Sequence, residues 1–175
     1  MFSLFFSLLL LDATTASLLP DRADINAFVG SYTYAGRSSD IASRQTAIEG
    51  AANEFNFLIR PIARSRLEKN CFVVEELHFS LDEDFLTINS EKKLPLKGRF
   101  DGKIVHTKDT EGKPIAFWRI WQSDKSFVQI IQSKIGERRV RMSLHEDGKI
   151  LKLEVTIVSE KLDNPLEFVS HYRRR

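Results

Sequence analysis

The sequence predicts a mainly β protein: a closed or nearly closed up-and-down antiparallel β-barrel of about ten strands, with a long helix inserted after strand one. Apolar residues follow a sustained helical period only between Ser39 and Lys69, whereas from Cys71 onward they alternate with a period of two. Short turns join the alternating runs, and the Asp-Gly pairs at 101–102 and 147–148 are strong hairpin signals. A meander of this length exposes its edge strands unless it closes on itself, which favours a barrel.

The first strand is expected at Phe28 to Gly36, where aromatic and small residues alternate. We expect it to pair with the last strand, because that pairing would close the meander. The helical pattern that follows contains Pro61, which removes a main-chain hydrogen bond. A straight helix of about 30 residues would be about 45 Å long, longer than a domain of this size is wide. A bent helix, or two helices that meet near Pro61, is therefore expected.

Period-two alternation and turn residues define nine further strands. They are expected at Cys71–Phe79, Phe85–Ser90, Leu94–Phe100, Lys103–Lys108, Ile115–Gln122, Ser126–Lys134, Arg138–His145, Lys149–Ser159 and Leu166–Arg173. Both faces of strand 115–122 are largely apolar, so one face should contact the barrel interior and the other should lie under the helix or a loop.

Residues 1–16 differ in composition from the rest of the chain. Leu8 to Leu11 complete an apolar block that lacks basic residues, and small residues follow up to Ser17. This pattern is typical of a secretory signal peptide, and the block is too short to span a bilayer, which takes roughly 20 apolar residues. We expect residues 1–16 to be a signal peptide and residues 17–175 to be a single domain, secreted or periplasmic, without a transmembrane segment. The alternative is a disordered tail.

Composition and motifs exclude several functions. The 26 basic and 24 acidic residues nearly balance, which argues against nucleic acid as a partner. The four histidines are not at metal-ligand spacing, and no nucleophile, Walker or dinucleotide motif is present. Cys71, the one cysteine of the chain, is expected to be a small buried hydrophobic residue. No catalytic residue, metal or cofactor is therefore predicted.

A barrel of eight to ten strands either fills its interior with side chains or leaves room for one small ligand. Two features favour a cavity. The thirteen Phe residues could line it, and the helix could cover its mouth or lie along the side of the barrel. If the face that carries Arg119 is inward, Arg119 needs an anion, either a carboxylate such as Glu75 or a ligand head group; otherwise it is an outward arginine. Arg138 and its neighbours are expected to be solvated, and Arg173 or Arg174 could close one barrel end over the ring of Tyr32.

The stretch Phe28-Val29-Gly30-Ser31-Tyr32 resembles the opening strand of the calycin superfamily, the lipocalins and fatty-acid-binding proteins, in which an aromatic residue follows a glycine by two positions. The ten-strand meander with a helical insert is similar to the fatty-acid-binding topology. In that family, an arginine and a tyrosine two residues apart on the last strand hold a ligand carboxylate. Tyr172 and Arg174 have this spacing in reversed order. Residues 56–67 and 162–174 also resemble an uncharacterised bacterial secreted family.

The resemblance implies binding or carriage of a small, largely apolar ligand, which could carry an acidic group, in a barrel cavity. The predicted ligand-binding residues are Tyr32, Phe117, Arg119, Trp121, Phe168, Tyr172 and Arg174. Two alternatives remain open. The barrel could be filled and serve as a structural or interaction module, with the helix or strand 115–122 as its contact surface. An enzyme would need an inward carboxylate such as Glu75 or Glu76 as its acid or base.

Overall fold

The computed structural model describes residues 19–91, 93–122 and 125–175. The predicted signal peptide lies outside the described residues. The elements in chain order are α1 (Arg22–Asn26), β1 (Gly30–Tyr34), α2 (Ser38–Asn53), α3 (Arg60–Asn70), β2 (Glu76–Asp82), β3 (Phe85–Ser90), β4 (Lys93–Gly98), β5 (Val105–Lys108), β6 (Pro114–Gln122), β7 (Ser126–Ser133), β8 (Gly136–His145), β9 (Ile150–Val158) and β10 (Leu166–Arg174). No helix among these is long and apolar enough to cross a membrane.

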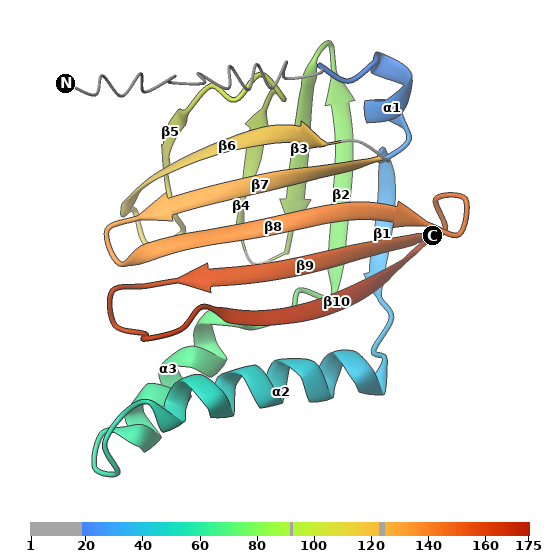
Figure 1. The fold of residues 1–175 in the computed structure, drawn as a ribbon. Helices are drawn as coiled ribbons and strands as arrows, with labels where there is room; N and C mark the ends of the chain where they lie inside the picture. Colours follow the sequence, from blue (N-terminus) through green and yellow to red (C-terminus); the bar gives the residue numbers. More distant parts are fainter. Residues whose placement is uncertain (1–18, 92, 123–124) are drawn as a thin grey trace, which may run out of the picture.

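The ten strands form one antiparallel sheet in the order β4-β3-β2-β1-β10-β9-β8-β7-β6-β5. β1 pairs with β2 on one side and with β10 on the other, with Tyr32 opposite Arg174. In Figure 1 the strands β6 to β10 cross in front of β2, β3 and β4, so the sheet curls into a barrel. β4 and β5 are its two unpaired edges, so the barrel is nearly closed. The predicted fold class and the predicted pairing of the first and last strands are both confirmed.

The predicted helical stretch consists of two helices, separated by residues 54–59. The chain turns there because the Asn56 side chain accepts a hydrogen bond from the Ile59 backbone N–H at 3.1 Å. Pro61 lies in the first turn of α3, where a missing N–H costs nothing because that N–H would have no partner within the helix. The break therefore precedes Pro61, and the expectation of two helices in this region is confirmed.

Several strand boundaries differ from the prediction by one or two residues, and the largest error is at the start of β2. The strand expected from Cys71 begins only at Glu76, because the Cys71 backbone N–H donates to the carbonyl of Leu67 at 2.8 Å and closes the last turn of α3. Residues 71–75 follow as irregular chain. Cys71 itself is buried, as expected.

Helix α2 lies alongside β10 and is held there at both ends (Figure 1). At its start, the buried Asp40 carboxylate accepts hydrogen bonds from the backbone N–H of His171 at 2.7 Å and pairs with His171 Nδ1 at 2.8 Å. At its end, the Glu54 carboxylate accepts from the Asp163 N–H at 2.8 Å and from the Asn164 amide at 3.0 Å. The helix therefore lies along the side of the barrel.

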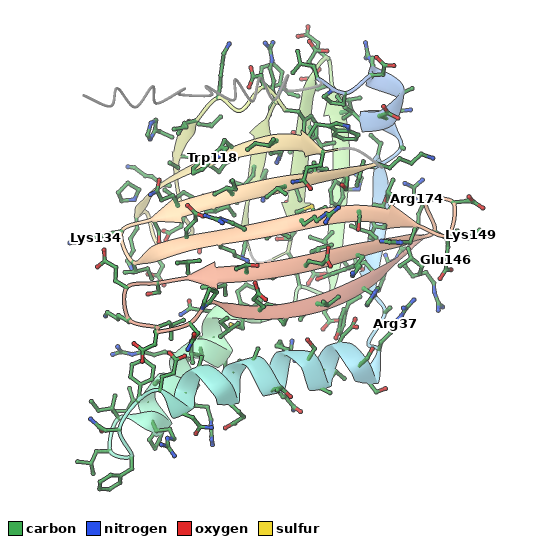
Figure 2. All side chains as sticks on the ribbon, viewed as in Figure 1. Arg37, Trp118, Lys134, Glu146, Lys149 and Arg174 are labelled. Atoms are coloured by element: carbon green, nitrogen blue, oxygen red, sulfur yellow. The ribbon has the colours of Figure 1, made fainter. Side chains whose placement is uncertain are left out.

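The outer face of β6 was expected to lie under the helix or a loop. The helix instead packs on β10, and Ile120 on the outer face of β6 is 39% exposed. Trp118 shares this face, and Figure 2 shows it on the outside of the front strands. Helix cover for this face was thus a wrong expectation.

Candidate functional site

The inward-facing side chains divide the barrel into a filled part and a hollow part. In the filled part, the ring of Phe127 lies 5.0 Å from the rings of Phe28 and Phe100 and 6.3 Å from that of Trp121. We refer to this group as the aromatic cluster. It consists of Phe28, Tyr32, Phe79, Phe100, Trp121 and Phe127. The Phe127 ring meets the Phe28 and Phe100 rings edge-on and stacks on that of Trp121, and such contacts add to apolar burial.

Arg174 closes the end of the aromatic cluster where β10 meets β1 (Figure 2). Its guanidinium lies 5.1 Å from the centre of the Tyr32 ring and donates to the Tyr32 hydroxyl and to the carbonyl of Ala27. The Tyr32 hydroxyl in turn donates to the Phe28 carbonyl at 3.0 Å. Burial raises the pKa of Tyr32, although Arg174 acts in the opposite direction. The predicted cation–π contact of Arg174 with Tyr32 is confirmed.

Arg119 points into the barrel and is fully buried, so the alternative of an outward arginine is wrong. Its Nε donates to the Gln129 side chain at 2.9 Å, and Nη2 donates to the carbonyl of Leu96 at 2.8 Å. Nη1 donates to the carbonyls of Leu86 and Gly98. Burial lowers the pKa of Arg119 to about 9.

These contacts show what Arg119 does in the fold. Its acceptors on β3 and β4 are backbone carbonyls, rather than a carboxylate such as Glu75. β6 is thereby tied to the far edge of the sheet, next to the gap between β4 and β5 where backbone pairing is missing. Phe117, next to it on the same face, packs on β4 so closely that a Cβ at Gly98 would lie 2.8 Å from the Phe117 ring. The two residues together seal this seam.

The hollow part is a cavity of about 90 Å³ for the centres of water-sized molecules, bounded by residues 72–74 and by β2 to β4 and β7 to β10. Most of its wall is apolar. The apolar lining residues are Phe72, Val73, Val74, Leu77, Ile88, Leu94, Leu96, Ile131, Val140, Met142, Leu153, Val155 and Phe168. The polar lining residues are Ser90, Lys93, Gln129, Arg138, Ser170 and Tyr172. Ligand pockets are typically about 300–1,000 Å³, so this cavity suits a small molecule or one end of a longer one.

Two of the seven predicted ligand-binding residues, Phe168 and Tyr172, line this cavity. Tyr172 also holds the irregular chain before β2, because its hydroxyl donates to the Val74 carbonyl at 3.1 Å. Burial raises the pKa of Tyr172. The other five residues lie in the aromatic cluster or at the seam. The structure therefore divides the predicted set between two places.

Two cations at the cavity were not among the predicted residues. Arg138 was expected to be solvated, but it is half-buried and faces inward on β8 with Val140 and Met142. Its Nη1 donates to the carbonyl of Asn70, at the end of α3, at 3.1 Å. Lys93 begins β4, and its ammonium lies 5.1 Å from the centre of the Phe72 ring.

The positive charge of Arg138 acts on Lys93. Burial lowers the pKa of Arg138, and burial together with the positive charge of Arg138 lowers the pKa of Lys93 to about 8. The alternation of Arg138 with Val140 and Met142 is the sequence signal that could have identified an inward arginine. Among the described residues, no group of three or more His, Cys, Asp or Glu side chains could hold a metal ion.

Comparison with known proteins bears on the fold. No protein-family model and no curated protein sequence matches the chain. Among solved structures, the chain is similar to a Schistosoma mansoni fatty-acid-binding protein in complex with arachidonic acid. The two sequences are 17% identical, the match covers 87% of this chain and 98% of the other, and the TM-score is 0.56. It also resembles secretory abundant heat soluble protein 4 from Ramazzottius varieornatus, with 14% identity, coverage of 86% and 96%, and a TM-score of 0.53. Echinococcus granulosus fatty-acid-binding protein 1 matches with 12% identity, coverage of 85% and 98%, and a TM-score of 0.51.

The chain has the fold of the fatty-acid-binding-protein-like calycin barrels. Within this barrel, Tyr172 and Arg174 both face inward from β10, but they lie in different parts of the interior. Tyr172 lines the cavity, whereas Arg174 is bonded to Tyr32 and Ala27 at the aromatic cluster. The structure does not bring these two side chains to one cavity.

The two surfaces considered for a filled interaction module are both partly exposed. At the junction of α2 and α3, Phe57 is 76% exposed and Leu58 is 71% exposed, and Ile59 and Ile62 are exposed beside them. The outer face of β6 carries Trp118 and the exposed Ile120.

Proposed function

We propose that this calycin barrel binds one small, largely apolar molecule in the cavity beneath residues 72–74. The observation that carries the proposal is the cavity itself, which is enclosed by mostly apolar side chains and has a few polar groups at fixed positions. Sites of this composition bind through apolar burial, worth roughly 25 cal/mol per Å², while the polar groups select the ligand. The Schistosoma mansoni protein of the same fold is in complex with arachidonic acid, which supports a lipid-like ligand class.

In this proposal, Phe168 and Tyr172 are the ligand-contacting residues from the set predicted by sequence. The aromatic cluster and the Arg119 seam form the rigid frame around the cavity. Ligand entry is expected to displace the irregular chain at 72–74, which lies over the cavity outside the strands and whose Val74 carbonyl accepts a hydrogen bond from the Tyr172 hydroxyl.

A neutral naphthalene-type dye tests the proposal. Its fluorescence should increase on titration with the protein, and Val155→Phe should abolish the increase, because Val155 is buried in the cavity wall. Val128→Phe is the matched control. It makes the same substitution on the outward face of β7, where Val128 lies opposite Ile120 and Arg141. No increase with the unmodified protein would favour the filled interaction module instead.

We also propose that residues 1–16 direct export of the chain and are then removed, on the composition argument given above. N-terminal sequencing of the protein from its own host tests this. A mature chain that begins near Ser17 supports export, and an intact Met1 contradicts it.

A further inference from the structure

We propose that the ligand is an amphiphilic anion whose charged group sits at the mouth of the cavity, between Lys93 and Arg138, while its apolar part points inward. This inference rests on the proposed function and adds the ligand class, the orientation and the selecting residues.

The first observation is the charge of the cavity lining. Two cations from two separate strands, Lys93 on β4 and Arg138 on β8, line it, and the described lining residues include no carboxylate. Among the ion pairs of the described chain, none involves either residue. Two like charges against an apolar wall cost free energy, and an anion between them relieves both. The lowered pKa of Lys93 is in accord with this arrangement.

The second observation is the difference between Arg138 and the other inward arginines. Arg119 donates to four acceptors of the protein, and Arg174 donates to two. For Arg138, one acceptor is found within the described chain, the carbonyl of Asn70. A guanidinium carries five N–H donors, so Arg138 keeps donors for a ligand and is also fixed in place by one bond. Fixed cations with spare donors make strong charge-assisted hydrogen bonds to carboxylates and phosphates.

The third observation is the distribution of polar and apolar side chains along the cavity, which sets the orientation of the ligand. Lys93 as a whole residue keeps solvent-exposed surface, while its ammonium packs over the Phe72 ring at the cavity, so Lys93 lies at the rim. The opposite wall consists of buried apolar side chains. These are Val140, Met142, Leu153, Val155 and Phe168. An amphiphile therefore fits with its charge at the rim and its chain against this wall.

The experiment compares chain-matched acids and alcohols by displacement of the neutral dye. At neutral pH, octanoate should bind at least about tenfold more tightly than octanol to the unmodified protein. Lys93→Gln and Arg138→Gln should each abolish most of this preference for the acid, the acid-to-alcohol ratio. Each variant should keep octanol affinity within about twofold of that of the unmodified protein. Arg139→Gln and Lys97→Gln are the matched controls, because these neighbours on the same strands are paired with Glu137 and Asp82 at the surface.

The outcomes separate the two proposals. If octanol and octanoate bind equally to the unmodified protein, the anion site is refuted and the proposed function stands. If neither binds, the proposed function itself fails. Should Arg138→Gln lower octanol affinity or stability, Arg138→Lys must restore the acid-to-alcohol ratio, and failure to do so contradicts a charge effect.

A second arm identifies the anion. Octyl phosphate competes with octanoate, and an advantage of either over octanol supports the site and ranks the head groups. Inorganic phosphate that binds as tightly as octyl phosphate would overturn the proposal, because the apolar part would then contribute nothing.

Discussion

The filled and hollow parts of this barrel share the same strands and the same alternation, yet they differ in the size and charge of their inward residues. In the filled part, aromatic rings contact one another in T-shaped, edge-to-face pairs, and Arg174 closes the end. In the hollow part most inward residues are aliphatic or small, such as Val140, Val155 and Ser170, although Phe168 and Tyr172 also line it, and two cations lie at the opening. The comparison teaches that side-chain volume at inward positions, rather than strand pattern, decides where a barrel is hollow.

The largest expected effect belongs to the filled part. Phe127→Ala should lower the free energy of unfolding by about 3–5 kcal/mol, because it removes a ring with no exposed surface from contacts with three other rings. Urea denaturation measures this change. Octanol affinity of the folded fraction should stay unchanged, and a selective loss of binding would contradict the separation of the two parts.

Arg119 gives the next largest effect. Arg119→Met should cost about 3 kcal/mol of stability, because the Leu86, Leu96 and Gly98 carbonyls lose their donor in a buried site. The acid-to-alcohol ratio should not change. A lower affinity for octanoate with unchanged octanol affinity would instead support the sequence-based role of Arg119 as the holder of an acidic head group.

The hollow part should respond in the opposite way. Val155→Phe should change the free energy of unfolding by no more than about 1 kcal/mol, since the new ring can extend into the cavity. Dye and octanol binding should fall at least about tenfold in the same variant. Calorimetric unfolding and dye titration on one preparation test both statements, and a large destabilisation would show that this part is as tightly packed as the aromatic cluster.

The smallest expected effect is a pH dependence caused by Lys93. Its pKa in the folded protein is about 8, below the ordinary value of 10.5. Between these values the unfolded chain binds a proton that the folded chain does not, so the free energy of unfolding should rise with pH. Urea denaturation between about pH 7.5 and about pH 9.5 should show a smaller rise for Lys93→Met than for the unmodified protein. The window ends below the raised pKa values of Tyr32 and Tyr172.

Alternation and turn residues were sufficient to predict the ten strands, the helical insert and the closure of β1 on β10. They could not place the cavity, because its position depends on which inward side chains meet across the barrel. The backbone acceptors of Arg119 belong to residues 21–33 positions away, on strands that alternation does not order in space. The prediction that Arg138 is solvated was wrong for a different reason. Arg138 was grouped by charge with the outward Arg139 and Arg141, although period-two alternation with Val140 places it on the inward face.

The position of β1 between β2 and β10 has a consequence for the order of assembly. The bond from Arg174 to Tyr32 joins residues 142 positions apart, and the nine residues of β10 end at Arg174. During synthesis β2 becomes available to β1 early, whereas β10 is the last of the described strands to be made, so the barrel can seal only after β10 has left the ribosome. Contacts of such long range form slowly. The barrel therefore remains open until its last strand is available to β1.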